Sequence, residues 1–416
     1  MFKRVVLAGL VAAAASMGVV AAADDKPTYP TLFDATWNAV NDNFYDPGFH
    51  GVDWKAVGDK YRARLGGVTN DKQFEALASA MLAEIGTSHL YILPPSASSA
   101  SGTGIGVRFH EIDGATIVTS IAPFADARQR GVHEGDRLLT PRDALSGTVG
   151  TPADAKFEDC AGNARTVTVH RIGAFSPPPH PGFEWRTFKT ADHHTVGYIR
   201  IDRFDDGAAE LADQAMVELK DTSSIVIDVR ANSGGNLSAL RLVSYFVDGS
   251  RPVAALFARP YLKALGRPVT GADVLGAFKT LDAYTDDSIF AAVSAHQGAA
   301  TFWTDDVGDK RYTKPVVVLI GEDTGSAAEG FAWAMKRAPH VKMVGRKTAG
   351  ALLSATDIDL PGGWRVVVPV QGVWGADGTD YRDRAVVPDV AVRWTRADVC
   401  AGRDPDIAEA LSLLNG

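Results

Sequence analysis

The stretch VVVLIGEDTGSAAEGFAWAMK (residues 316–336) places a polar, glycine-containing loop between an apolar run and a helical pattern. The run VVVLI is almost entirely β-branched, as expected for a strand that is buried on both faces of a sheet. The loop ends at Ser326, where the helix is predicted to begin, and Glu329 follows three residues later. The sequence therefore predicts a strand–loop–helix unit with a serine at the helix N-terminus.

Ser326 supports two interpretations. Ser326 and Glu329 have the spacing of a capping box, in which both side chains satisfy free backbone N–H groups at the start of a helix. The same position also suits a nucleophile, because the positive end of the helix dipole stabilises negative charge. The N–H of Ala327 would then point at the oxyanion formed on an attacked carbonyl. Spacing alone does not separate the two interpretations.

A second glycine-containing corner lies in SSIVIDVRANSGGN (223–236). An apolar strand runs directly into Gly234 and Gly235, and α/β proteins place ligand-binding groups at the carboxyl ends of such strands. Glycine N–H groups there would supply the other half of an oxyanion hole. The alternative is a plain turn capped by Asn232 or Ser233. Ser233 is also a rival nucleophile, although no base-bearing motif is tied to it.

The rest of the chain divides into three parts. Residues 24–95 have helical periodicity, and residues 101–173 form short alternating runs separated by turn residues. Proline-rich stretches follow each of these parts. Residues 183–416 alternate strands with helices, which predicts βαβ units and a mostly parallel sheet. Residues 251–312 are less regular and are interpreted as an insertion with some helix.

The first 23 residues indicate the compartment. A basic start, an apolar middle and small residues before the first acids are typical of a signal peptide, with cleavage near Ala22 or Ala23. The alternative is a membrane anchor, which the glycines and serine of this stretch disfavour. We therefore expect a periplasmic or secreted protein with no stable membrane insertion after cleavage. The net charge of −8 argues against a nucleic-acid partner.

The chain contains two cysteines, Cys160 and Cys400. An oxidising compartment would allow them to pair, but they fall in different predicted domains, so two isolated thiols are the expected state. No cluster of cysteine and histidine has metal-ligand spacing, and neither a metal nor another cofactor is expected. The sequence does not indicate the oligomeric state.

Five stretches, in this order, carry a family resemblance: GYIRIDRF, IVIDVRANSGG, VVVLIGEDTGSAAEG, VGRKTAG and VVPDVAV. They resemble the tail-specific, or C-terminal processing, serine peptidases, whose superfamily includes the tricorn protease core. The runs GIGVRF, GVHEGDRLL and VTVHRI resemble the PDZ-like domain of these enzymes. The resemblance implies an α/β and α+β multidomain protein with an N-terminal helical domain, a PDZ-like β unit and a crotonase-like α/β catalytic core. It also implies peptide or protein substrates, attack by Ser326, and an oxyanion hole from Gly234 or Gly235 with Ala327.

The sequence departs from the tail-specific pattern at the base. Those enzymes usually carry a lysine in a TFGKG segment, whereas this chain has TAGAL (348–352) with Ala351 at the lysine position. Lys347 matches a non-catalytic position. The tricorn-like branch instead uses a histidine oriented by the preceding serine, and EIGTSHLYILPP (84–95) contains Ser88 and His89 in that arrangement. An imidazole is suited to general-base work near neutral pH. The alternative is an ordinary loop histidine.

The acid that would support His89 is less well defined. Ser88 is the first candidate partner by resemblance. In DYRDRAVVPDV (380–390) the expected glutamate is absent, so Asp383 is the nearest carboxylate and Asp380 its rival. Glu329 would either polarise the site or only cap the helix. A different class of function stays open: a catalytically inactive peptide- or partner-binding protein on a peptidase scaffold.

Overall fold

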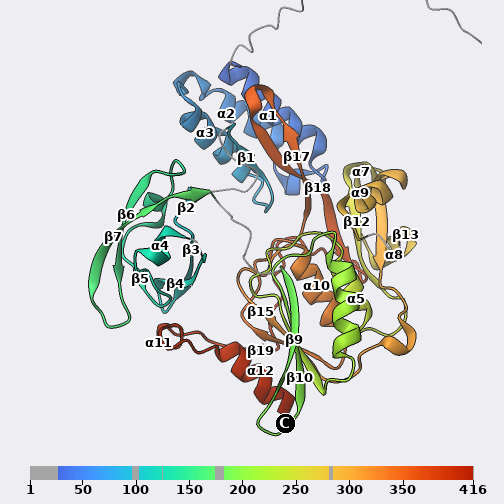
Figure 1. Cartoon of the computed structure of the whole chain (residues 1–416). Coiled ribbons are helices and arrows are strands. Elements are labelled where there is room, and N and C mark those ends of the chain that lie inside the picture. The colour runs from blue at the N-terminus through green and yellow to red at the C-terminus, as the bar shows by residue number, and fades with distance from the viewer. Residues whose placement is uncertain (1–26, 96–102, 124, 174–181, 281–283, 416) are drawn as a thin grey trace, which may run out of the picture.

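A computed structural model describes residues 27–95, 103–123, 125–173, 182–280 and 284–415 (Figure 1). The predicted signal peptide at 1–23 lies outside the described residues, as do most of both proline-rich stretches between domains. Among the helices that the structure describes, none is long and apolar enough to cross a bilayer.

The N-terminal part is helical, as predicted. Its helices are α1 (Tyr29–Asn43), α2 (Trp54–Arg62) and α3 (Asp71–Ala83), with short 3-10 turns at Phe49–Gly51 and Leu65–Gly67. Each α-helix begins at a polar side chain that accepts a hydrogen bond from a first-turn amide; these caps are Thr28, Asp53 and Asn70. Past the end of α3, Gly86 adopts a positive φ of 64°, which ends the helical path before the Ser88–His89 turn.

A long strand, β18 (Arg365–Gly375), joins the helical part to the rest of the chain (Figure 1). Its first half pairs on one edge with β1 (Tyr91–Leu93) and on the other with β17 (Ser354–Asp359). Its second half pairs with β12 (Pro252–Ala258). The strand therefore runs from one hydrophobic cluster into another, with Val366 in the helical part and Val373 in the α/β core.

The middle part is a five-stranded antiparallel sheet in the order β3-β4-β5-β6-β7, with a separate pair of short strands, β2 and β8. The bounds are β2 (Thr103–Gly104), β3 (Val107–Ile112), β4 (Ala115–Ile121), α4 (Asp126–Gln129), β5 (Arg137–Leu138), a 3-10 turn (Arg142–Leu145), β6 (Pro152–Glu158), β7 (Ala164–His170) and β8 (Ile172–Gly173). Asp113 and Gly114 both have positive φ between β3 and β4, as a tight hairpin turn requires. The predicted β-rich unit is confirmed.

The α/β core is built on a six-stranded sheet in the order β19-β16-β15-β11-β10-β9. All neighbouring strands are parallel except the edge pair β10–β9, so the predicted mostly parallel sheet is confirmed. The bounds are β9 (Phe183–Lys189), β10 (Thr195–Ile201), α5 (Ala208–Leu219), β11 (Ser224–Asp228), α6 (Ala239–Ser244), β15 (Val316–Ile320), α10 (Ala327–Met335), β16 (Val341–Gly345) and β19 (Val390–Ala391).

Both faces of this sheet are covered, which explains the uninterrupted apolar strands. Ile227 and Val318 pack in a large cluster with residues of α5, α6 and α10. The alternate residues Val226 and Val317 face the other side, where they join Ala410 of the C-terminal helix α12 (Pro405–Asn415). Every residue of β11 and β15 is buried as a result.

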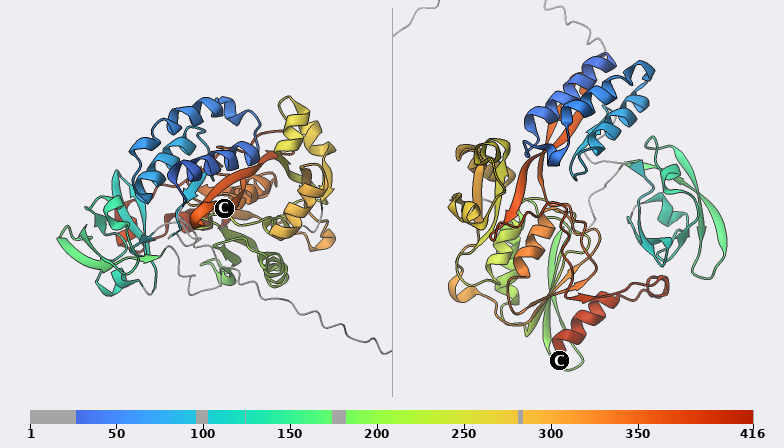
Figure 2. Two further views of the ribbon diagram at one scale, coloured as in Figure 1. Left: turned by 90° about the horizontal axis from the view of Figure 1, so that it is seen from above. Right: turned by 180° about the vertical axis from the view of Figure 1, so that it is seen from behind.

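Residues 251–312 are more regular than the sequence indicated. Besides β12 they contain α7 (Arg259–Leu265), α8 (Gly271–Gly276), β13 (Phe278–Thr280), α9 (Asp286–Ala295), β14 (Ala299–Trp303) and a 3-10 turn (Gly308–Lys310). The three strands extend the sheet of β18 in the order β18-β12-β14-β13. Figure 2 shows this unit beside the core. Periodicity missed it because each element is short and pairs with strands distant in sequence.

The expectation of two isolated thiols was wrong. Cys160 and Cys400 form a disulfide that spans 240 residues. The C-terminal segment containing α11 (Arg396–Cys400) returns to the middle part, where Arg396 donates to the carbonyls of Gly135 and Glu158 at 3.0 and 2.9 Å. Sequence distance and domain assignment gave no sign that these two segments meet.

Candidate active site

Ser326 lies where the sequence predicts it, between the buried strand β15 and the first residue of α10. Its backbone has φ 50° and ψ −123°, a positive-φ conformation that is costly for a residue with a side chain. Strain of this kind is concentrated at functional sites, where surrounding bonds enforce it. Here the Gly325 N–H donates to the Asn232 carbonyl at 3.0 Å, and Thr324 Oγ1 donates to the Val229 carbonyl at 2.8 Å. The serine loop is thus fixed to the loop that follows β11.

The two loops approach so closely that only glycine fits at their contact. A Cβ on Gly234 would lie 2.7 Å from Ser326 Cβ and 3.1 Å from the Ala327 nitrogen. A Cβ on Gly235 would lie 1.6 Å from the carbonyl oxygen of Phe204. Both glycines have positive φ, at 119° and 132°. The structure therefore brings Gly234 to the serine, while Gly235 packs against the backbone of Phe204.

These candidate donors differ in how they are used. The Gly234 N–H donates to Asn232 Oδ1 at 2.8 Å, so an internal acceptor already satisfies it. The N–H groups of Gly235 and Ala327 have no hydrogen-bond acceptor among the residues that the structure describes. Ser326 and Ala327 are partly exposed, whereas Asn232 is fully buried. The unbonded N–H groups are thus that of Ala327, directly after the serine, and that of Gly235, directly after the glycine that contacts Ser326.

Glu329 is fully buried and accepts four hydrogen bonds. Its Oε1 receives Thr348 Oγ1 at 2.6 Å and the Gly350 N–H at 2.7 Å. Its Oε2 receives the N–H groups of Ala351 at 2.6 Å and Ser326 at 3.2 Å. Burial raises the pKa of Glu329, and these hydrogen bonds oppose the rise. The carboxylate reaches back to Ser326, as in a capping box, and also anchors the 348–351 loop.

His89 adopts φ 58° in the turn between α3 and β1, where its side chain is partly buried. Its Nδ1 lies 3.1 Å from Ser88 Oγ, so the predicted Ser88–His89 pair is formed. Burial lowers the pKa of His89, which favours the neutral imidazole. No hydrogen bond joins His89 to Ser326 among the described residues. The structure therefore orients the imidazole without bringing it into contact with the hydroxyl.

The two predicted acids, Asp380 and Asp383, flank Arg382 in the sequence. Asp380 is partly buried, receives the Arg382 N–H at 2.9 Å and pairs with the Arg382 guanidinium at 3.2 Å. Burial raises the pKa of Asp380. Burial and the nearby Arg382 lower the pKa of His50, a shift that Asp380 and Asp383 oppose. Asp383 is exposed. Neither acid is hydrogen-bonded to His89 among the described residues, and His50 was not singled out by the sequence analysis.

His50 itself is held by an aromatic and acidic pocket. Its Nε2 lies 2.9 Å from the hydroxyl of Tyr45, and Asp46 Oδ2 accepts the His50 N–H at 2.7 Å. The Tyr45 N–H in turn donates to the Pro369 carbonyl of β18 at 3.0 Å. The motif DNFYDPGFHG (42–51) carried no recognisable signal for this arrangement, because the contact that ties it to β18, from Tyr45 to Pro369, joins segments far apart in the chain.

Comparison with known proteins agrees with this architecture. Residues 195–392 match peptidase family S41, and residues 25–83 match the tricorn protease C1 domain. A tricorn protease homolog of Streptomyces coelicolor is 26% identical over 94% of this chain and 32% of its own length. The chloroplastic C-terminal processing peptidase of Tetradesmus obliquus is 23% identical over 86% of this chain and 76% of its own length.

The solved structure of the photosystem II D1 C-terminal processing protease superimposes with a TM-score of 0.58 at 22% identity. The alignment covers 94% of this chain and 98% of that one, so the two share a fold. The chain spans about a third of the length of the tricorn homologs that it matches. The chain thus contains a peptidase family S41 segment that carries Ser326 and a tricorn protease C1 segment that ends just before His89, and it is similar to tricorn-like and C-terminal processing peptidases.

Proposed function

We propose that this protein is an exported serine endopeptidase that hydrolyses peptide bonds with Ser326 as its nucleophile. The observation that carries the proposal is the conformation of the serine loop. Ser326 is held at positive φ on a helix N-terminus in contact with Gly234, and the N–H groups of the following residues, Ala327 and Gly235, have no acceptor in the described chain. This arrangement suits a tetrahedral intermediate, whose oxyanion needs preorganised N–H donors.

In the proposed reaction, His89 takes the proton of Ser326 Oγ as the oxygen attacks the substrate carbonyl. The imidazolium then gives this proton to the leaving amine as the C–N bond breaks, and water releases the acyl group by the same route in reverse. Ser88 supports the tautomer with a free Nε2, because its oxygen can accept the Nδ1 proton. Since no hydrogen bond joins His89 to Ser326 in the described chain, this step requires the two loops to approach when substrate binds.

Two further assignments belong to the proposal. The central and middle units are interpreted as a crotonase-like catalytic core and a PDZ-like domain. Location in the periplasm or outside the cell is supported by the sequence of residues 1–23 and by the Cys160–Cys400 disulfide, since disulfides persist in oxidising compartments. Peptides or proteins are the substrate class that the family implies.

A fluorophosphonate probe tests the proposal directly, because it reacts only with an activated serine. We expect the wild-type protein to be labelled at Ser326 and to cleave unstructured protein substrates, while Ser326→Ala does neither and keeps the same circular dichroism spectrum. Ser233→Ala is the matched control on the facing loop and is expected to be labelled like wild type. An unlabelled but correctly folded wild-type protein would favour the non-catalytic, peptide-binding alternative.

A further inference from the structure

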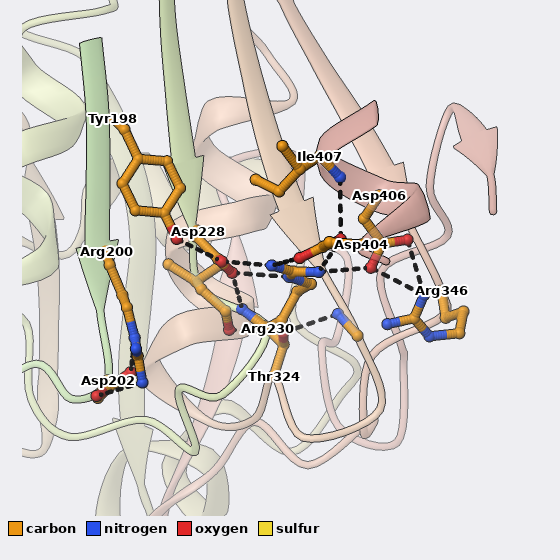
Figure 3. Close-up of polar contacts among 12 residues, drawn as sticks. Tyr198, Arg200, Asp202, Asp228, Arg230, Thr324, Arg346, Asp404, Asp406 and Ile407 are labelled. Carbon is orange, nitrogen blue, oxygen red and sulfur yellow. Dashed lines mark hydrogen bonds and ion pairs between the residues drawn. The ribbon is translucent and has the colours of Figure 1, made fainter. Parts of the chain in front are cut away.

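A cluster of buried charges lies beside the catalytic loops and takes no part in the proposed reaction (Figure 3). At its centre is Arg230, whose five N–H donors are all used. Its Nε and Nη2 donate to Asp228 at 2.9 and 2.6 Å. Its Nη1 and Nη2 donate to Asp404 at 2.9 Å each, and Nη1 also donates to Asp406 at 2.9 Å. The guanidinium is therefore fixed from several sides.

Asp406 connects this arginine to a second one. It is fully buried in the first turn of α12, where the helix dipole favours a carboxylate. It accepts Arg230 on one side and Arg346 Nη1 on the other, at 2.8 and 3.0 Å. Arg346 directly follows β16, and its Nε donates to Glu322 Oε2 at 3.0 Å. Asp406 thus links residues that follow three different strands of the core sheet.

These links end on the loops that carry the proposed chemistry. Arg230 lies two residues before Asn232, whose carbonyl and side-chain oxygens hold the Gly325 and Gly234 N–H groups. Glu322 lies four residues before Ser326 on the serine loop. The C-terminal helix, through Asp406, therefore reaches both sides of the oxyanion site.

A purely stabilising role explains this cluster poorly. Taking charges out of water costs free energy that ion pairing often fails to recover, so apolar packing would stabilise such a position as well or better. Hydrogen-bonded ion pairs do, however, fix direction and distance, since each bidentate arginine accepts only a narrow geometry. The cluster holds residues of the two loops that contain Asn232 and Ser326, where such precision affects turnover.

We infer that Asp406 is a positioning residue that sets the separation of the oxyanion loop and the serine loop through Arg230 and Arg346. The inference rests on the proposed function. Asp406 does not touch the reacting atoms. Its removal should displace the loops that do, leaving the sheet and its cores in place.

The test compares Asp406→Asn with Glu409→Gln, which makes the same chemical change three residues later on α12. A loop displacement of about 1 Å lowers turnover by about 100-fold. We expect Asp406→Asn to lose about this factor in kcat and in the rate of fluorophosphonate labelling, with KM unchanged. A merely structural role would lower the melting temperature and leave kcat of the folded protein intact. Glu409→Gln is expected to match wild type.

Hydrogen exchange gives a readout that does not depend on activity. Amides of residues 229–235 and 321–326 should exchange faster in Asp406→Asn than in wild type, while β11 and β15 stay protected. Unchanged exchange in both loops, or wild-type kcat, overturns the inference whether or not the protein proves to be a peptidase. If Asp406→Asn does not fold, Glu322→Gln replaces it, because its half-exposed carboxylate belongs to the same set of ion pairs. Lowered kcat and faster exchange at 321–326 in that variant support the inference, and wild-type values refute it.

Discussion

Replacing Glu329 by glutamine tests whether its carboxylate organises the site. The substitution preserves shape and keeps one oxygen, which can still accept the N–H groups of Ser326 and Ala351. The NH2 group of the glutamine then takes the place of Oε1, which accepts the Gly350 N–H at 2.7 Å in the wild type. Two donors face each other there, and the Gly350 N–H loses its acceptor. Thr348 Oγ1 already receives the Val386 N–H at 2.7 Å but has another lone pair for the amide.

The expected loss of stability follows from the hydrogen bonds that the glutamine keeps and the one that it loses. One buried backbone donor left without an acceptor costs about 1–3 kcal/mol. The two retained bonds also become neutral rather than charge-assisted, which weakens them. Burial of the carboxylate also costs free energy of desolvation, which is why it raises the pKa of Glu329. The neutral glutamine avoids this desolvation cost and so offsets part of the loss. We therefore expect the free energy of unfolding to fall by about 2 kcal/mol, within the 5–15 kcal/mol typical of folded proteins.

The pH dependence of this loss has a definite sign. Because the pKa of Glu329 is raised in the folded state, the native protein holds this proton more tightly than the unfolded chain. Its contribution is fully present below the ordinary glutamate pKa of about 4.3 and declines as pH rises through the folded-state value. Glutamine does not titrate. The difference in stability between wild type and variant should thus be larger in mild acid than at neutral pH.

Urea unfolding followed by tryptophan fluorescence measures these differences. Glu210→Gln is the control, since Glu210 is an exposed acid in the first turn of another core helix, α5. We expect Glu210→Gln to unfold like wild type. Equal stability of Glu329→Gln and Glu210→Gln at neutral pH would refute the claim that the carboxylate anchors the 348–351 loop.

Three further predictions concern separate parts of the molecule. Because burial lowers the pKa of His89 and the neutral imidazole is the base, kcat/KM should fall only below about pH 6.5, and His89→Gln should remove this acidic limb together with activity. Gly235→Ala should destabilise the protein by about 3 kcal/mol or more, because its Cβ would lie 1.6 Å from a backbone oxygen at φ 132°, whereas Gly66→Ala, with no atom within 4 Å, should be neutral. Reducing Cys160–Cys400 should lower the free energy of unfolding by up to about 5 kcal/mol, since the bond closes a loop of 240 residues; unchanged urea midpoints would contradict this.

The parts of the fold that the sequence predicts are those that local patterns determine. The apolar run at 316–320 and its following helix are correct because burial on both faces and a capped helix start leave a signature within a dozen residues. The long strand β18, the regular unit at 251–312 and the disulfide were not predicted. Each depends on pairing between segments far apart in the chain, for which alternation and propensity carry no information.

The same limit applies to the site. The spacing of Ser326 and Glu329 gives the capping contact, but not the two further backbone donors and the threonine hydroxyl from 348–351. Backbone groups have no residue-type signature. The acids at 380 and 383 were predicted to support His89, but neither is hydrogen-bonded to it among the described residues, and Asp380 pairs with Arg382.

Position 351 carries alanine where the tail-specific peptidases usually have a lysine, and β18 connects this position to the turn that contains His89. Ala351 contributes its backbone N–H to Glu329, and its methyl side chain cannot act as a base, so the proposed reaction takes its base from His89. The turn containing His89 leads into β1, and the loop containing Ala351 leads into β17; both strands pair with the first half of β18.

The second half of β18 pairs with β12, and Pro369 lies between the two halves, where it lacks an N–H for the ladder. The β17–β18 register also shifts there, between Ser354 and Ala355. A proline and a bulge at one point give a strand its natural place to bend. Bending β18 at Pro369 would carry β1 and the residues of β17 that follow Ala355 relative to the second half of β18, which pairs with Ser354 and β12. Such a bend is one way for the His89 turn, which leads into β1, to approach Ser326, while the carboxylate of Glu329 keeps the 348–351 loop bonded to the serine loop.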